Sequence, residues 1–368
     1  MGKVVKLVIS FLVLSMPYFY LKNFCDEDKV NKISSRAKDS VCFSKSSELN
    51  SADSILIYEF KNRDIDVESS PLDTPLSFAS KNYARFDLYN ERTIQNLKNN
   101  HFEDYKLITR SMIDPDGDQK IEKDLIHAYL KKVFPDRASR GMLVIDWESR
   151  TFQTLKKRES TNSAFKAAEE VFISIVKTIK NIRPNLQVGI YGIPFRPTLK
   201  EANKQNIQWI DSFNTDTKWQ TLLSHVDFLA PSFYIIYADE QIGHENNIIF
   251  LELQLKNALL YSATLNKPVY PFFWYRIAST PAVNSTYGRT IIPRQTIIKY
   301  LDFISSYRYM NRRISGLLWW DPREEIRIGY GSVQRDTSNE NSIQYQGRDE
   351  IINEYAETLN QKFRFLRE

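Results

Sequence analysis

The chain has 368 residues, of which 42% are hydrophobic and 13% aromatic, enough for a large core and one barrel domain of about 300 residues. Its 50 Lys and Arg residues nearly balance 45 Asp and Glu residues, for a net charge of +5. No basic block stands out, which argues against nucleic acid as a partner. A mildly basic surface is compatible instead with an acidic polysaccharide.

The first residues have the pattern of an export segment. Lys3 and Lys6 precede an apolar run over 7–21 that is too short and too interrupted for a transmembrane helix. We therefore expect residues 1–21 to be a signal peptide or an N-terminal anchor. The protein would then be secreted, periplasmic, or anchored to a membrane facing outward.

A polar linker is predicted over 22–52, followed by one domain over 53–368. Both cysteines, Cys25 and Cys42, lie in the linker. No disulfide framework is therefore expected in the domain itself.

From residue 53 onward, apolar β-type runs alternate with helical stretches. Seven runs are predicted strands: 54–60, 105–112, 142–147, 187–191, 226–232, 268–274 and 314–319. The clearest predicted helices are 120–133, 162–182 and 246–265. This alternation predicts an α/β fold with a parallel sheet covered by helices. Seven strands favour a single closed (β/α) barrel, similar to a TIM barrel, and the sequence has no Gly-x-Gly-x-x-Gly pattern of a nucleotide-binding fold.

The third predicted strand ends in two acids, within the run G-M-L-V-I-D-W-E at 141–148. Side chains two apart on a strand share a face, so Asp146 and Glu148 are predicted to point one way and Trp147 the other. Two close carboxylates cannot both ionise easily, so one keeps a proton near neutral pH. A glycosidase needs such a proton donor. Helix capping or pairing with Lys or Arg is the alternative explanation of the same run.

Other predicted strands end in aromatic and polar residues, and these ends form the active site of a β/α barrel. The candidates for substrate binding are Tyr191, Tyr234, Trp274, Arg276, Trp319 and Trp320. Each aromatic residue, taken singly, is more typical of packing. Several of them around one acidic pair indicate a sugar subsite with aromatic walls and hydroxyl donors.

These motifs resemble, in order, those of the hyaluronidases, glycoside hydrolase family 56. The matching segments are V-I-D-W-E at 144–148, Arg183-Pro184 followed by G-I-Y-G-I-P at 189–194, L-A-P-S-F-Y at 229–234, P-V-Y at 268–270, and Gly316 with Trp320. The resemblance implies a seven-stranded barrel that hydrolyses an N-acetylhexosamine polysaccharide such as hyaluronan or chondroitin.

Several positions depart from the family pattern. The barrel has no cysteine, Ala230 replaces a tyrosine, and no arginine follows P-V-Y in register, although Arg276 lies nearby. The chain therefore looks like a distant, microbial relative, and the identity of the polysaccharide is left open.

The resemblance also implies a retaining, substrate-assisted mechanism without a cofactor. Glu148 would protonate the glycosidic oxygen while the substrate's acetamido oxygen attacks the anomeric carbon. Asp146 would orient the acetamido group, and its charge would help Glu148 to keep its proton. Tyr191 and Tyr234 would form hydrogen bonds to the sugar, and Trp320 would close the pocket behind the acetamido methyl group.

Two other functions fit parts of the pattern. A chitinase-like hydrolase also has D-W-E. Such enzymes carry a further acid at the position of Val144 in this chain, and an Asp at the position of Ile235. A sugar-binding barrel without turnover is the second alternative, although it would not need both acids.

No metal site is predicted. The run from Asp114 resembles a calcium loop, but Gln119 and Leu125 stand where Gly and Glu are expected. The four histidines show no ligand spacing.

Overall fold

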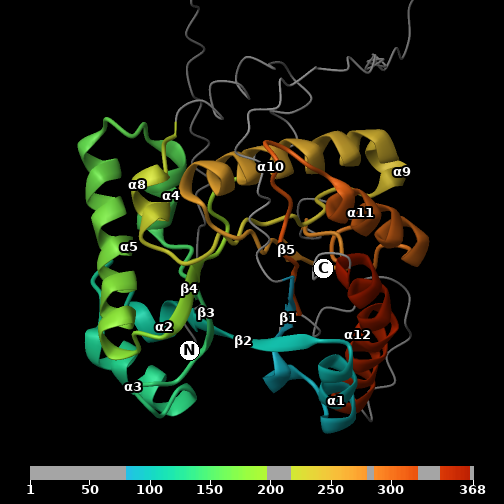
Figure 1. The fold of residues 1–368 in the computed structure, drawn as a ribbon, viewed down its shortest axis with the longest axis horizontal. Coiled ribbons are helices and arrows are strands. Elements are labelled where there is room, and N and C mark those ends of the chain that lie inside the picture. The colour runs from blue at the N-terminus through green and yellow to red at the C-terminus, as the bar shows by residue number, and fades with distance from the viewer. Residues whose placement is uncertain (1–79, 197–216, 280–285, 322–339, 365–368) are drawn as a thin grey trace, which may run out of the picture. The chain divides into compact units, whose positions relative to one another are not determined.

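The computed structural model describes residues 80–196, 217–279, 286–321 and 340–364, all of which belong to one compact unit, Glu68–Glu368 (Figure 1). The expected export segment, the linker, both cysteines and the predicted strand at 54–60 lie outside the described residues. Among the described helices, none is long and apolar enough to cross a membrane.

Six parallel strands form one sheet that curls into a half-barrel. They are β1 (Asn82–Ala84), β2 (Phe102–Thr109), β3 (Gly141–Asp146), β4 (Leu186–Ile190), β5 (Phe272–Phe273) and β6 (Leu318–Trp319). Their order in the sheet is β4-β3-β2-β1-β6-β5, so β1 pairs with β2 on one side and with β6 on the other. All pairs are parallel, and the α/β class expected from the alternating pattern is confirmed.

The predicted strand at 226–232 does not form a regular strand. It makes isolated parallel bridges, Ala230 to Tyr191 next to β4 and Ser232 to Phe272 in β5. Backbone hydrogen bonds run the same way, from Asp227 N to Val188 O at 2.7 Å and from Leu229 N to Pro268 O at 2.9 Å. This segment therefore bonds to neighbours on both sides although its own ladder is short.

Other element limits also differ from the prediction. The predicted strand at 105–112 begins earlier and gives way to helix α2 (Arg110–Ile113), and β1 was not predicted because three residues carry too little pattern. The predicted helices correspond to α3 (Lys123–Val133), α5 (Ser163–Ile182) and α10 (His244–Leu265). The remaining α-helices, which the prediction did not specify, are α1 (Glu91–Asn99), α4 (Arg150–Lys157), α8 (Gln220–Ser224), α9 (Asp239–Ile242), α11 (Arg294–Ser306) and α12 (Glu340–Arg364).

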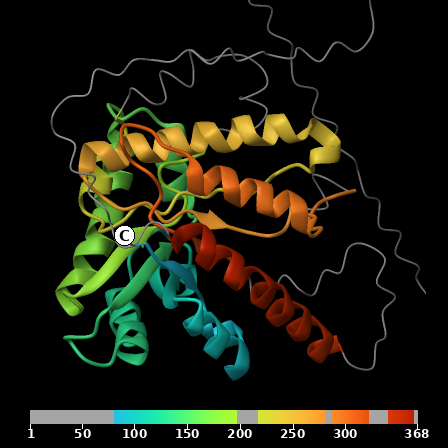
Figure 2. The same ribbon diagram turned by 45° about the vertical axis from the view of Figure 1, so that its right-hand side comes forward.

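The helices pack on one another in succession around the sheet. Helix α3 packs against α5, α5 against α8, α8 against α10, α10 against α11, α11 against α12, and α12 against α1. Figures 1 and 2 show this layer from α5 in green to α12 in red. Helix α5 illustrates why it forms: Asn162 caps its first turn, and residues such as Phe165, Phe172 and Ile179 bury one stripe.

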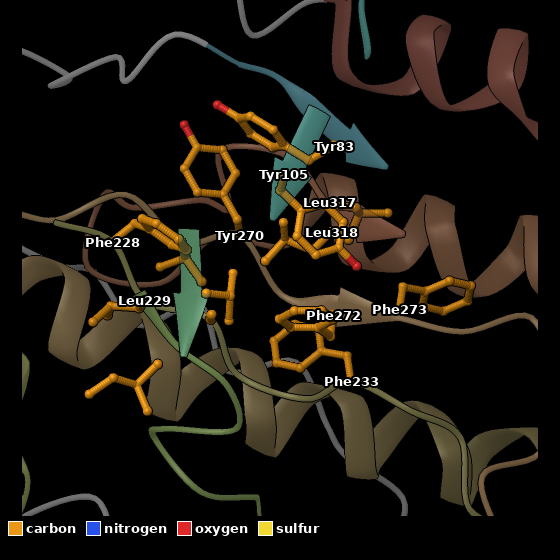
Figure 3. Close-up of a cluster of buried hydrophobic side chains, with 14 of the residues drawn as sticks. Tyr83, Tyr105, Phe228, Leu229, Phe233, Tyr270, Phe272, Phe273, Leu317 and Leu318 are labelled. Carbon is orange, nitrogen blue, oxygen red and sulfur yellow. The ribbon is translucent and has the colours of Figure 1, made fainter. Parts of the chain in front are cut away.

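The core inside the curled sheet is largely aromatic (Figure 3). Tyr270 lies 5.2 Å from the ring of Tyr83 and 5.8 Å from that of Phe228. Gly189 on β4 leaves the space that Phe228 fills, since a Cβ at Gly189 would lie 2.4 Å from the Phe228 ring. These rings join β1 and β4 to the segments between β4 and β5.

The first strand is also tied to the last helix. The Asn82 side chain donates to Leu359 O of α12 at 3.3 Å and accepts from Leu317 N at 3.1 Å. Gly316 permits this approach, because a Cβ there would lie 1.8 Å from Lys81 O and its φ is +142°.

Candidate active site

The two predicted acids, Asp146 and Glu148, lie two residues apart at the carboxyl end of β3. Trp147, between them, is buried against Phe172 of α5 with ring centroids 5.5 Å apart, so it faces the helix layer as predicted. Asp146 is half-buried and Glu148 is exposed. Within the described ranges, neither carboxylate forms a hydrogen bond or an ion pair with another residue. Capping or salt-bridge formation inside this part of the chain therefore does not explain them.

Both carboxylates have a raised pKa. Burial, and after it the charge of Glu148, raise the pKa of Asp146 to about 7 against the opposing effect of Arg85. Partial burial also raises the pKa of Glu148, although the Glu148 side chain still contacts solvent. The positive charges of Arg196 and Lys156 act in the opposite direction and lower this pKa. The sequence predicted the proton on Glu148, whereas the larger rise falls on Asp146. The physical reason is that Asp146 lies deeper and that two cations act on Glu148.

Two of the candidate binding residues, Tyr191 and Tyr234, stand beside the acids. Tyr191 follows β4, its N–H donates to Ile145 O at 2.9 Å, and its ring lies 6.1 Å from that of Tyr234. The Tyr191 hydroxyl donates to Ser232 Oγ at 3.4 Å. Burial raises the pKa of Tyr191 to about 12 and that of Tyr234 well above its ordinary value, and the carboxylates act in the same direction. Both hydroxyls therefore stay protonated at neutral pH.

A buried ring, Phe272, underlies this group. It lies 5.0 Å from the ring of Tyr191, 5.8 Å from that of Tyr105 and 6.0 Å from that of Trp320. Phe272 is fully buried, while Trp320 remains partly exposed above it. The structure thus brings Tyr191, Tyr234 and Trp320 together at the carboxyl edge of the sheet.

The other three predicted binding residues are placed differently. Trp274 is buried beside Tyr234, with ring centroids 5.9 Å apart. Trp319 is also buried and faces the other way, stacked on Tyr275 at 5.6 Å and next to Tyr355 of α12 at 5.5 Å. Trp319 therefore packs sheet against helix and offers no surface to a sugar.

Arg276 does not join the acids either. Its guanidinium lies 5.2 Å from the Tyr275 ring centre, and Nη1 donates to Arg289 O at 3.0 Å. Arg289 in turn lies over Trp274 at 4.9 Å, at the edge of the aromatic group.

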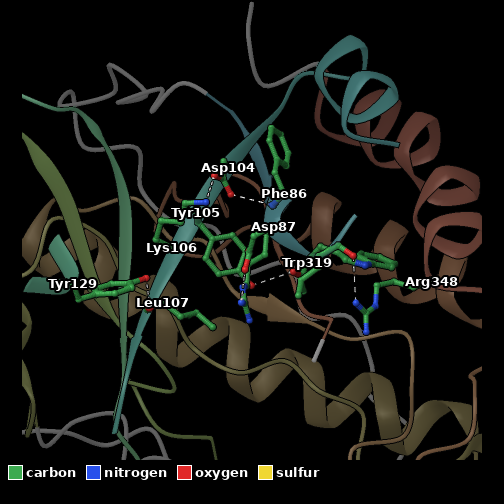
Figure 4. A network of polar contacts seen from close by, with 11 residues as sticks. Phe86, Asp87, Asp104, Tyr105, Lys106, Leu107, Tyr129, Trp319 and Arg348 are labelled. Atoms are coloured by element: carbon green, nitrogen blue, oxygen red, sulfur yellow. Dashed lines mark hydrogen bonds and ion pairs between the residues drawn. The ribbon is translucent and has the colours of Figure 1, made fainter. Parts of the chain in front are cut away.

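The structure adds residues that sequence reasoning missed. Arg85 directly follows β1 and Arg196 lies shortly after β4, whereas Lys156 lies on α4. Arg85 is paired with Asp87 at 2.9 Å, and the Tyr105 hydroxyl donates to Trp319 O at 3.2 Å (Figure 4). Arg196 and Arg85 both follow the carboxyl end of a strand, and a search for charged residues at strand ends could have found Arg196. Arg85 could not be found in this way because β1 itself was not predicted.

A second buried acid lies just past β6. Asp321 accepts hydrogen bonds from Tyr89 at 2.9 Å and Tyr275 at 3.0 Å, and it lies 3.7 Å from Nε of the buried Arg348 on α12. Burial raises the pKa of Asp321 to about 6. Its partners make it a structural anchor for the last helix.

No group of three or more His, Cys, Asp or Glu residues in the described part of the chain is arranged to hold a metal ion. In the stretch that resembles a calcium loop, Asp118 pairs with Lys120 at 2.6 Å and Asp114 accepts from Gln119 N at 3.3 Å. The Asp118 side chain also accepts from Lys120 N at 2.9 Å.

Comparison with solved structures places the fold. A monoclinic crystal structure of bee venom hyaluronidase superposes with a TM-score of 0.54 at 15% identity, covering 77% of this chain and all (100%) of that one. Bee venom hyaluronidase in complex with a hyaluronic acid tetramer gives 0.52 at 14% identity, covering 75% and 96%. Neither a protein-family model nor a curated protein sequence matches the chain. The fold is therefore similar to that of a hyaluronidase, and at this low sequence identity the similarity concerns the fold alone.

Proposed function

We propose that this protein is a glycoside hydrolase that cleaves an N-acetylhexosamine-containing polysaccharide, hyaluronan or chondroitin in type. The observation that carries the proposal is the pair Asp146 and Glu148, without hydrogen-bond partners in the described ranges, at the carboxyl end of β3 beside Tyr191 and Tyr234. The similarity of the fold to bee venom hyaluronidase, one structure of which holds a hyaluronic acid tetramer, supports the substrate class.

The catalytic step uses Glu148 as the general acid and then as the base. It lies at the exposed edge, where a glycosidic oxygen of a long polymer has access, and its raised pKa favours the protonated form. After the leaving sugar departs, the Glu148 carboxylate activates water for the second step.

Asp146 lies deeper and acts on the acetamido group. Attack by the acetamido oxygen places positive charge on the ring that forms, and an adjacent carboxylate stabilises that charge. Because the pKa of Asp146 is about 7 and that of Glu148 is also raised, the two carboxyl groups titrate as a unit and share a proton on the acid side of neutrality. In the proposed mechanism that proton lies on Glu148 and Asp146 is ionised when the acetamido oxygen attacks. Tyr191 and Tyr234 form hydrogen bonds with the sugar through their hydroxyl groups, and Trp320 covers the acetamido methyl group.

Two broader features belong to the same proposal. In this proposal the segment 226–232 takes the place of a seventh strand and closes the half-barrel, because it bonds to residues next to β4 and in β5. Export through residues 1–21 would give the enzyme access to an extracellular polymer.

Product analysis on defined polymers tests the proposal. The full chain is incubated with hyaluronan, unsulfated chondroitin, chitin oligomers and de-N-acetylated hyaluronan, and the products are identified by mass spectrometry. Cleavage of the first two with resistance of the last is expected. The Glu148→Gln variant should lose at least about 10²-fold in rate while still binding the polymer. Turnover at the wild-type rate in that variant shows that Glu148 is not the acid, and cleavage of chitin alone favours the chitinase-like alternative.

A further inference from the structure

Arg196 has an unusual position for a cation. It lies beyond Pro194, just past the end of β4, and its Nη1 donates to Tyr234 O at 3.1 Å. That bond holds the half-buried guanidinium beside the two tyrosines of the candidate site. Its remaining N–H groups make no hydrogen bond and no ion pair with any residue in the described ranges.

Glu148, the acid that acts on Arg196, does not satisfy this guanidinium. Glu148 interacts with Arg196 through space, but the two form no ion pair within 4 Å in the described structure. Arg196 is half-buried, so its guanidinium is partly removed from water, and this burial lowers its pKa. A partly desolvated guanidinium with unused donors is a ready partner for an anion.

The surroundings of Arg196 favour a carboxylate on a sugar. Its guanidinium can bind a carboxylate through two parallel N–H bonds, a geometry that a flexible ammonium group does not offer. The Tyr191 and Tyr234 hydroxyls beside it suit the neutral part of a sugar ring. Further positive charge acts on the two acids from Arg85 after β1, which affects Asp146, and from Lys156 on α4, which affects Glu148.

We propose that Arg196 is a specificity-determining residue that binds the carboxylate of a hexuronate unit next to the scissile N-acetylhexosamine. This inference rests on the proposed function and names the residue through which the enzyme prefers an acidic polymer over a neutral one. No bond is made or broken at Arg196.

The same contact couples substrate charge to acid catalysis. The charged groups that act on Glu148 are Arg196 after β4 and Lys156 on α4, and Glu148 in turn acts on Asp146 at the end of β3 and on Tyr191 after β4. In the free enzyme Arg196 favours ionised Glu148. A bound hexuronate compensates that positive charge, so Glu148 keeps its proton to higher pH when the acidic substrate is in place.

Binding of matched ligands tests the assignment without requiring turnover. A hyaluronan hexasaccharide and its carboxyl-reduced form are titrated into the full chain carrying Glu148→Gln, with and without Arg196→Gln, by isothermal calorimetry. The Arg196 change should weaken binding of the acidic ligand by at least about tenfold and leave the carboxyl-reduced ligand within about twofold. Equal losses for both ligands, or no loss for either, overturn the inference.

Two further variants keep the result interpretable. Arg140→Gln removes the same charge from an exposed position at the amino end of β3 and should change neither affinity appreciably. Arg196→Lys keeps the charge but loses the forked geometry, so it should show an intermediate loss confined to the acidic ligand, and it serves if Arg196→Gln does not fold.

The pH profile distinguishes the inference from the proposed function. On hyaluronan, the alkaline limb of kcat should lie at higher pH than that of kcat/KM, and the difference should vanish in Arg196→Gln. If the wild type cleaves N-acetylhexosamine polymers but shows no such difference, the role of Arg196 is wrong and the glycosidase stands. If it cleaves no polymer, the proposed function fails, and the binding titration alone decides the role of Arg196.

Discussion

Asp146 is the residue whose environment departs furthest from water among the candidate catalytic groups. Its pKa rises from 3.8 in the unfolded chain to about 7 in the fold. The folded state therefore binds more protons than the unfolded state between these values. By linkage, this group makes the folded state less stable as pH rises from about 4 to 7, and the loss is complete above that range.

Asp146→Asn should remove that loss. Relative to the wild type, the variant should gain unfolding free energy between pH 4 and pH 8, by a few kcal/mol at most, since one pKa unit corresponds to about 1.4 kcal/mol. Urea unfolding at several pH values measures the difference. Asp124→Asn, on the exposed face of α3, is the control for loss of one carboxylate. A pH dependence no larger than in the control contradicts the assigned environment of Asp146.

Neighbouring tryptophans at the end of β6 should respond oppositely to truncation. Trp320→Ala should weaken binding of a thiazoline mimic of the intermediate by about five- to tenfold, because burial of one methyl group contributes roughly 1 kcal/mol. Trp319→Ala should instead cost about 3–5 kcal/mol of stability, since its ring is buried between Tyr275 and Tyr355. Inhibitor titration and chemical denaturation of both variants give the comparison. Weakened inhibitor binding in a stable Trp319→Ala protein would reverse the two roles.

For single residues, the sequence predicted the features that follow from the alternation of side chains along a strand and from the position of the strand ends. It placed Asp146, Trp147 and Tyr191 correctly relative to β3 and β4. It did not separate Trp319 from Trp320, because which face of a two-residue strand turns inward depends on packing against α12. Arg196 was missed for a similar reason, since its partner is a backbone carbonyl that the fold brings near it.

At the scale of elements, short strands limit what the sequence can predict. The run at 142–147 is long and apolar and was placed within one residue of β3, whereas β1 has three residues and was missed. The run at 226–232 is β-type in composition, yet it forms isolated bridges. Pro231 within it lacks the N–H that a regular ladder requires.

Gly189 on β4 offers a test of how the elements interlock. Gly189→Ala should cost about 1–3 kcal/mol, because the new methyl group would overlap the buried Phe228 ring. Gly347→Ala is the matched control: nothing lies within 4 Å of a Cβ there, and it should stabilise α12 by about 0.5–1 kcal/mol. Thermal and urea unfolding compare the two. Equal effects would show that Phe228 does not occupy the space beside Gly189.

At the scale of the whole molecule, positive charge accompanies the candidate site. The chain carries +5, and Arg85, Lys156 and Arg196 lie close enough to act on the two acids. Charges of this kind attract a polyanion over a distance that salt shortens, to about 10 Å at 0.1 M and 3 Å at 1 M.

The KM for hyaluronan should therefore rise several-fold between 50 mM and 500 mM NaCl, with a smaller change in kcat. Carboxyl-reduced hyaluronan has no charge to attract, so its KM should stay nearly constant. Initial rates on both polymers across the salt series provide the measurement. Parallel changes for the two would assign the effect to the protein's conformation instead of substrate attraction.

The position of β1 in the sheet has a consequence for how the chain is made. Strand β1 lies between β2, which follows it closely, and β6, and Asn82 bonds to Leu317, 235 residues later. At a synthesis rate of about 5–20 residues per second, the ribosome needs roughly 10–50 s to deliver that partner. During this interval one hydrogen-bonding edge of β1 has no native neighbour, which is the kind of edge on which nascent chains associate wrongly. We therefore expect association of nascent chains to fall when this edge is shielded until β6 has emerged.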